Sequence, residues 1–441
     1  MSDLLLIWVG LLVALLAFAV RTPGTGGALI LSYFLGLSLI HVPGALIYLD
    51  PLSIAPSRIE TELGFTLTII GMAAFVAGAI FARATYAQGS FVSTADAVPA
   101  LSPHIWPLII FGVISYFILM PRASAIPSGT ALVSSLATLL IIGLWLRFYT
   151  ANSTGNYGRT LTTLLILPLL PLATLTTGGF IGFGVYWALS CITFLFVIAR
   201  RRFWFYLGSP FFGLLSLSLF AVYFSVRDTI RIVVGVVGAG LFDRLAAIWE
   251  IVSRFEVLDL NSPLLIFAID QRLNQNYLVG YAAERYQAGA VDLLYGSTIQ
   301  LWALVPRAVW PDKPEVGGGG DIVSHFTGMA FAEGTSVGAG QVLEFYMNFG
   351  VPGLIIGFFV LGMVLMGLDL GIMRSLRSAD MRGLLLYAMP GLTLMQPGGN
   401  LLEIMVAVVG AIVASRLIIL GGFFGTAPDR PIPKSVPDIA E

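Results

Sequence analysis

Charged residues are scarce in this sequence. Asp, Glu, Lys and Arg make up 11% of the 441 residues, whereas 57% are hydrophobic, and the mean hydropathy is +0.91. Soluble globular chains are about 25% charged, so this chain cannot cover a water-facing surface. The composition excludes a soluble enzyme, a disordered protein and a nucleic-acid-binding protein that relies on a basic face. It predicts an all-α polytopic membrane protein.

Cysteine, histidine and lysine are also rare. Cys191 is the only cysteine, which excludes an intrachain disulfide and a thiolate metal cluster. The histidines at positions 41, 104 and 325 lie far apart and match no metal-binding spacing. We therefore expect no metal site and no cofactor. The net charge of −1 indicates no partner by bulk electrostatics.

Long apolar runs are abundant, and a spanning helix needs about 20 mainly apolar residues. Eleven such runs predict about 11 transmembrane helices: Leu4–Val20, Ala28–Tyr48, Phe65–Phe81, Ile105–Met120, Ala131–Phe148, Leu161–Leu175, Phe180–Ala199, Phe203–Ser225, Val351–Gly371, Gly383–Met395 and Leu401–Gly421. They divide the chain into an eight-helix membrane region (1–225), a large loop (226–350), a three-helix membrane region (351–421) and a tail (422–441).

The arginines predict the orientation of these spans. Of the short connections, one alternate set carries only Arg58 and Arg122, and the other set carries Arg21, Arg83, Arg147, Arg159, Arg200, Arg201, Arg202, Arg374, Arg377 and Arg382. The positive-inside rule makes the arginine-rich set cytoplasmic. The N-terminus and the large loop are then outside, and the C-terminal tail is inside.

The large loop holds 13 of the 24 acidic and eight of the 23 basic residues. In Leu241–Arg254, apolar residues recur at helical spacing, which predicts an amphipathic helix on the bundle or in the membrane interface. Four arginines of the loop are candidates to converge on a diphosphate: Arg227, Arg231, Arg272 and Arg285. The alternative for each one is a solvated charge.

The segment Leu304–Pro314 (LVPRAVWPDKP) is rich in proline, which restricts the backbone of its neighbours. Arg307 offers a planar fork for phosphate oxygens, and Lys313 offers a point charge. Trp310 can stack on a sugar or sit at the membrane interface. The segment indicates a site for an anionic headgroup; the alternative is a surface turn with solvated charges.

Four consecutive glycines, Gly317–Gly320, follow directly and are typical of a mobile lid. Histidine is the side chain that most often acts as a general base, so His325 is the candidate base for a sugar hydroxyl. Glu344, a few residues before a predicted span, is the second candidate. The alternatives are a structural histidine and a solvated glutamate.

Other patterns in the sequence suggest different chemistry, but the neighbouring elements that this chemistry needs are not predicted. The sequence GTSVG (Gly334–Gly338) fits the G-x-S-x-G pattern of serine hydrolases, but no strand is predicted before it. Glu60 and Glu62 suggest a metal-binding pair, without an Asp-x-Asp motif. Asp369 and Glu403, near span ends, suggest either proton relays or snorkelling carboxylates.

The run Gly383–Met395 is short, contains Pro390 and leads into the turn Gln396–Asn400. Irregular backbone near membrane depth is tolerated only where protein or a water-filled cavity surrounds it. The predicted topology places this turn on the same side as the large loop. We expect it to form part of the floor of the site.

These features together resemble the Wzy-type polymerases of O-antigen and exopolysaccharide repeat units. The resemblance rests on many spans, a late external loop, the LVPRAVWPDKP segment, the glycine run and EFYMNFGVPG (Glu344–Gly353), and it covers roughly residues 220–375. It implies a GT-C-like, metal-independent glycosyltransferase of the bacterial inner membrane, with its large loop in the periplasm. Such an enzyme transfers a growing glycan from undecaprenyl diphosphate to the next lipid-linked repeat unit.

The resemblance also implies partners: the undecaprenyl-diphosphate-linked oligosaccharide, membrane lipids, a chain-length regulator and a flippase. One alternative is an O-antigen ligase, which transfers the finished glycan to lipid A. An alternative from another class is a flippase or transporter of lipid-linked sugars. A transporter is expected to carry charges inside the bundle and to lack a loop of this size.

The predicted topology can be tested with reporter fusions. Fusions at Arg201 and Arg377 are expected to score cytoplasmic, and a fusion at Gly318 is expected to score external. An external Arg201 would contradict both the parity of the spans and the side on which the site is placed.

Overall fold

The computed structural model describes residues 1–21, 26–86, 97–123, 129–178, 181–199, 262–297, 304–305, 309–312, 319–330 and 337–422, with residues 205, 208, 223, 243, 245, 246, 249 and 253. These residues contain helices and no β-strand, which confirms the all-α prediction. The helices before the large loop are α1 (Ser2–Arg21), α2 (Ala28–Leu46), α3 (Arg58–Tyr86), α4 (Ala97–Leu101), the 3₁₀-helix η1 (Ser102–His104), α5 (Ile105–Ile114), the π-helical turn η2 (Ser115–Leu119), α6 (Met120–Ala123), α7 (Gly129–Ala137), α8 (Leu139–Ser153), α9 (Tyr157–Leu164), α10 (Leu169–Gly178) and α11 (Gly182–Ile198). Those that follow are α14 (Pro263–Arg272), α15 (Gln275–Gln287), α16 (Gly319–Thr327), α17 (Gly340–Ser378), α18 (Met381–Leu394) and α19 (Leu401–Leu420).

Eight helical stretches in the described part of the chain are long and apolar enough to cross a membrane: Ser2–Ala19, Ala28–Leu46, Arg58–Tyr86, Ala97–Ala123, Gly129–Ser153, Tyr157–Leu175, Gly340–Ser378 and Leu401–Leu420. This confirms a polytopic membrane protein. Helices α11 and α18, with 17 and 14 residues, are shorter. Most of the predicted span 203–225 lies outside the described residues, so the count of eleven stays a prediction.

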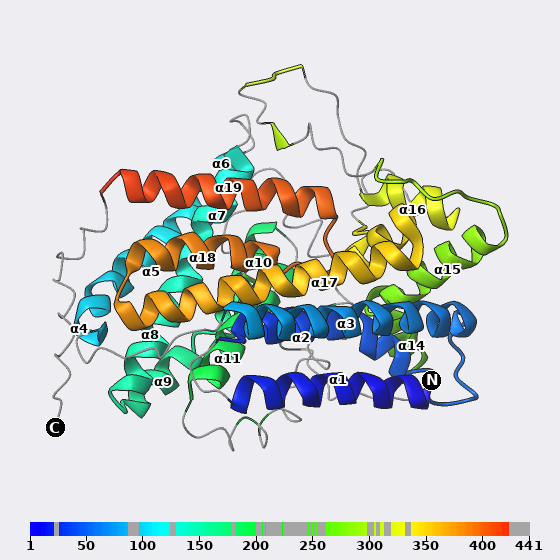
Figure 1. Cartoon of the computed structure of the whole chain (residues 1–441), viewed down its shortest axis with the longest axis horizontal. Coiled ribbons are helices and arrows are strands. Elements are labelled where there is room, and N and C mark those ends of the chain that lie inside the picture. Colours follow the sequence, from blue (N-terminus) through cyan, green and yellow to red (C-terminus); the bar gives the residue numbers. More distant parts are fainter. Residues whose placement is uncertain are drawn as a thin grey trace, which may run out of the picture.

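The long helices lie side by side and form a bundle with two distinct ends (Figure 1). Helices α14, α15 and α16 gather at the end where the N-terminus lies, which we call the loop end. Helices α4, α8 and α9 lie at the opposite end. That end carries Arg83, Arg147, Arg159, Arg374 and Arg377, and we call it the arginine end.

Helix α3 packs against α17 through glycines. Gly71 and Gly78 are seven residues apart and share a face of α3. A Cβ atom at Gly78 would lie 2.0 Å from the carbonyl oxygen of Phe359, and one at Gly362 would lie 2.1 Å from that of Phe75. Small residues let membrane helices approach this closely, and the contact then gains dispersion energy along both backbones. The two helices form the centre of the bundle.

A third glycine on the same face of α3, Gly64, brings in α15 from the large loop. A Cβ at Gly64 would lie 1.9 Å from the carbonyl oxygen of Asn276, and one at Gly280 would lie 1.8 Å from that of Glu60. Helix α15 therefore packs backbone to backbone on α3. This part of the loop is built into the bundle and does not merely rest on it.

Helix α17 contains a break just before the predicted span. Phe349 and Gly350 have non-helical backbone angles, and Gly350 has φ 66°. Loop residues satisfy nearby carbonyl groups: the Leu294 N–H donates to the Met347 oxygen at 3.0 Å, and the Tyr295 N–H donates to the Asn348 oxygen at 2.9 Å. The break separates a short first segment, 340–348, from the long apolar part of the helix.

Asp369 is not a snorkelling carboxylate. Its side chain is 1% exposed and accepts hydrogen bonds from the N–H groups of Leu29, at 3.0 and 3.1 Å, and Ile30, at 3.2 Å. Asp369 on α17 therefore caps the N-terminus of α2, where a negative charge also interacts well with the helix dipole. The snorkelling prediction is wrong because the carboxylate has found buried N–H donors within the bundle.

The contact between α3 and α15 makes a stability prediction. Gly280→Ala places a methyl group on the backbone of α3 and is expected to destabilise the protein by about 1–3 kcal/mol. Thermal unfolding of the detergent-purified protein measures this. Gly182→Ala is the control, because a Cβ at Gly182 meets nothing within 4 Å. Equal midpoints for the two variants would show that α15 does not pack on α3 this closely.

Candidate functional site

Three consecutive polar residues mark the start of α15: Asn274, which is its N-cap, and Gln275 and Asn276, its first two residues. We call them the Asn-Gln-Asn triplet. Successive residues at a helix start point in different directions, about 100° apart around the axis. The three side chains therefore reach three different parts of the loop end. Their contacts assemble the candidate site.

Asn276 binds a histidine that the sequence analysis had set aside. Its side-chain oxygen lies 2.6 Å from Nδ1 of His41 on α2, and its Nδ2 donates to the His41 carbonyl oxygen at 2.7 Å. Thr68 on α3 lies 3.4 Å from the same ring nitrogen. All three side chains are buried. No sequence motif indicates the contact between His41 and Asn276, because the two residues are 235 positions apart in the sequence.

Asn274 joins a second buried group, around Asp270 of α14. Its Nδ2 donates to Asp270 Oδ1 at 2.7 Å and to Thr61 Oγ1 at 2.8 Å, and the Tyr48 hydroxyl donates to Asp270 Oδ1 at 3.0 Å. Burial raises the pKa of the Tyr48 hydroxyl, and the Asp270 carboxylate raises it further. The group ties α14 to the ends of α2 and α3.

Gln275 contacts the start of α17 and the turn Gln396–Asn400. A Cβ at Gly340 would lie 2.6 Å from its side-chain oxygen, and one at Gly398 would lie 3.2 Å from its nitrogen. The Gln341 N–H donates to the Pro397 oxygen at 3.2 Å, and the Tyr33 hydroxyl donates to the Gln341 side chain. The prediction that this turn lies against the large loop is confirmed.

Glu344 is buried, with 1% of its surface exposed, and its carboxylate accepts a hydrogen bond from the Leu401 N–H. Glu344 therefore caps α19, so the alternative of a solvated boundary glutamate is wrong. Beside it, Asn400 donates to Glu403 Oε1 at 2.9 Å and accepts from the Ala339 N–H at 3.0 Å. Both acidic residues of this region serve the start of α19.

Helix α16 carries His325 to the same region. Its first residue is Gly319, which lies in the predicted glycine lid. A Cβ at Gly319 would lie 2.3 Å from the Val337 oxygen and 2.4 Å from the Asn400 side chain. Gly319 and Gly320 are therefore helical, and Gly319 is packed, whereas Gly317 and Gly318 lie outside the described residues. His325, further along α16, has an exposed side chain.

Arg285 on α15 lies beside the end of α16. A Cβ at Gly328 would come within 2.5 Å of its Nη1, and its Nε is buried without an acceptor among the described residues. Next to it, Tyr286 meets Tyr346 of α17 edge to face, with centroids 6.4 Å apart. The structure thus places Arg285 beside the end of α16, the helix that carries His325.

The structure describes only some of the other predicted site residues. Arg272 ends α14 and is exposed, and Trp310 is 42% exposed. Four predicted residues lie outside the described residues: Arg227, Arg231, Arg307 and Lys313. In the predicted helix Leu241–Arg254, the five described residues are helical: Asp243, Leu245, Ala246, Trp249 and Ser253.

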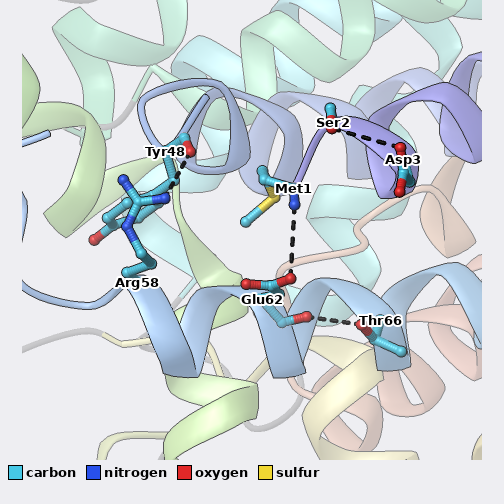
Figure 2. A network of polar contacts seen from close by, with 7 residues as sticks. All are labelled: Met1, Ser2, Asp3, Tyr48, Arg58, Glu62 and Thr66. Carbon is cyan, nitrogen blue, oxygen red and sulfur yellow. Dashed lines mark hydrogen bonds and ion pairs between the residues drawn. The ribbon is translucent and has the colours of Figure 1, made fainter. Parts of the chain in front are cut away.

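Glu60 and Glu62 do not form a metal-binding pair. Both lie in α3, where side chains two residues apart point in different directions. Glu62 lies 3.6 Å from the Met1 amino group, and the nearby Arg58 donates to the Tyr48 carbonyl oxygen at 2.9 Å (Figure 2). Within the described ranges, no three His, Cys, Asp or Glu side chains are grouped as metal ligands.

Glu60 instead lies near Glu284 of α15. Burial raises the pKa of Glu284, and the Glu60 carboxylate raises it further.

No protein-family model, curated protein or solved structure matches this chain. The residues that suggest a function therefore lie at the loop end: Arg285 on α15, His325 on α16 and the buried polar network of the Asn-Gln-Asn triplet.

The capping role of Glu344 makes the next prediction. Glu344→Ala leaves the buried Leu401 N–H without an acceptor and is expected to cost about 1–3 kcal/mol of stability. Glu344→Gln keeps an acceptor oxygen and is expected to lose much less. Thermal unfolding of both variants measures the difference. Glu62→Ala is the control: this glutamate is 54% exposed, and its loss should have little effect.

Proposed function

We propose that this chain is an integral-membrane glycosyltransferase that polymerises lipid-linked oligosaccharide repeat units, as the Wzy-type polymerases do. It would transfer the growing glycan from undecaprenyl diphosphate to the next lipid-linked repeat unit at the outer face of a bacterial inner membrane. The observation that carries the proposal is the meeting of Arg285, the helix of His325 and the turn Gln396–Asn400 at the loop end. This end lies opposite the arginine end.

The chemistry of such a transfer matches the residues gathered there. A hydroxyl oxygen of the acceptor sugar attacks the anomeric carbon, the bond from that carbon to the diphosphate oxygen breaks, and the diphosphate leaves with its negative charge. An arginine fork stabilises that charge. Arg285 has the position for this role, with Arg272 and the predicted Arg307 and Lys313 as further contributors.

The acceptor hydroxyl must also lose its proton. His325 is exposed, and histidine is the side chain that most often serves as a general base. Glu344 is less suited to this task, because its carboxylate is buried and already binds the Leu401 N–H. We therefore assign proton removal to His325 and the positioning of α19 to Glu344.

The direct test is the purified protein with a synthetic undecaprenyl-diphosphate-linked repeat unit. A ladder of lipid-linked oligomers would support the polymerase. Deletion of the gene in its host separates the alternatives. Surface glycan reduced to single repeats supports a polymerase, whereas complete polymer that stays unattached to lipid A would instead indicate a ligase. Loss of all repeat units from the outer face would indicate a flippase.

His325 gives a specific prediction within this assay. His325→Ala is expected to cut turnover at least about tenfold, since a positioned general base typically contributes 10²–10⁴-fold. Binding of the lipid-linked substrate should change little. His104→Ala is the matched control, because His104 belongs to η1, next to α4 at the arginine end. Full turnover by His325→Ala would remove this histidine from the mechanism.

A further inference from the structure

A separate cavity of about 240 Å³ lies at the arginine end, and none of the residues assigned to the glycosyl transfer lines it. It is lined by the end of α3, one face of α17 and the middle of α18: Tyr86, Gly367, Leu370, Gly371, Arg374 and Tyr387. We call it the Arg374 cavity. Gly367 forms part of its floor, because glycine leaves space where another residue would project, whereas Gly371 packs against Tyr387: a Cβ at Gly371 would lie 2.5 Å from the Tyr387 ring. A Cβ at Gly367 meets nothing within 4 Å.

The mouth of the Arg374 cavity carries positive charge and aromatic hydroxyl groups. Arg374, Tyr86 and Tyr387 are all exposed. Arg377, one turn further along α17, adds a second cation to the same end. The charge here fits an anion.

An apolar stripe on α17 leads to the cavity. Ile356, Val360 and Val364 are 63%, 50% and 44% exposed. They are four residues apart and continue to Gly367 and Gly371 at steps of three or four, so they share one face of the helix. The stripe belongs to the long apolar part of α17 and faces outward from the bundle. An acyl chain can lie along it with its head at Arg374.

We propose that the Arg374 cavity binds the headgroup phosphate of an anionic phospholipid, whose acyl chain lies along the stripe of Ile356, Val360 and Val364. The cavity is smaller than the range of about 300–1,000 Å³ typical of pockets that enclose whole ligands. It therefore fits the phosphate part of a lipid whose chains stay outside. Basic pockets between helices on the cytoplasmic side are a general form of anionic-lipid site, and tyrosines favour this depth of the membrane.

The experiment compares lipid binding by the full-length purified protein and its variants. Native mass spectrometry with phosphatidylglycerol and phosphatidylcholine, titrated separately, gives the apparent affinity for each lipid. Arg374→Ala is expected to weaken phosphatidylglycerol binding about fivefold, the usual contribution of one basic residue near an anionic lipid. Gly367→Leu fills the cavity floor and is expected to weaken it at least as much. Phosphatidylcholine binding should respond less to Arg374→Ala.

Two variants serve as matched controls. Arg382→Ala removes an exposed arginine at the same end that does not line the cavity. Gly10→Leu adds the same side chain at a glycine of α1 that also has nothing within 4 Å. Both should keep the affinity of the unmodified protein, and thermal unfolding verifies that all four variants fold.

Either of two results would overturn the proposal. One is that Arg374→Ala and Gly367→Leu, both folded, bind phosphatidylglycerol as the controls do. The other is that inorganic phosphate displaces phosphatidylglycerol at equal concentration, which would make the cavity a site for free anions. The outcome is independent of the proposed polymerase activity, because the readout is lipid binding and the cavity contains none of the residues assigned to the transfer.

Discussion

The close approach of α15 to α3 is the contact on which the loop end depends. At Gly64 and Gly280, each backbone lies where the other helix has no side chain. Only at this distance can the Asn-Gln-Asn triplet reach α2, α14 and α17 at the same time. A buried polar side chain costs free energy unless it is hydrogen-bonded, and Asn274 and Asn276 obtain hydrogen bonds from neighbouring helices. Tight glycine packing and polar bonding are therefore one arrangement: the first makes the second possible.

Carboxylates inside a membrane bundle usually suggest function, yet two of those on α17 do structural work. Asp369 binds the N-terminus of α2, and Glu344 binds that of α19. Each satisfies N–H groups that a helix start leaves open, and each places negative charge at the positive end of a helix dipole. One long helix thus orients two others, at opposite ends of the bundle. With these two carboxylates in structural roles, the proposed glycosyl transfer relies on Arg285 and His325.

Hydropathy and arginine placement were enough to predict the helical class, most of the spans and the grouping of the loop with the turn Gln396–Asn400. They depend on local sequence, which a single chain displays. The glycines at 64, 71 and 78 were a further local signal, since a seven-residue period marks one helix face. The contacts of His41 and Asp369 had no such signal. Their partners are 235 and about 340 residues away, and only the folded chain brings them together.

The break at Phe349 and Gly350 determines the depth at which the loop end lies relative to the membrane. An unbroken helix of 39 residues would be about 58 Å long, nearly twice the hydrocarbon thickness of about 30 Å. The long apolar part of α17 fills that thickness by itself, so the segment with Gln341 and Glu344 belongs at the boundary between hydrocarbon and headgroups. A molecule with a lipid tail and a water-soluble head would meet its two preferred environments on either side of this one glycine.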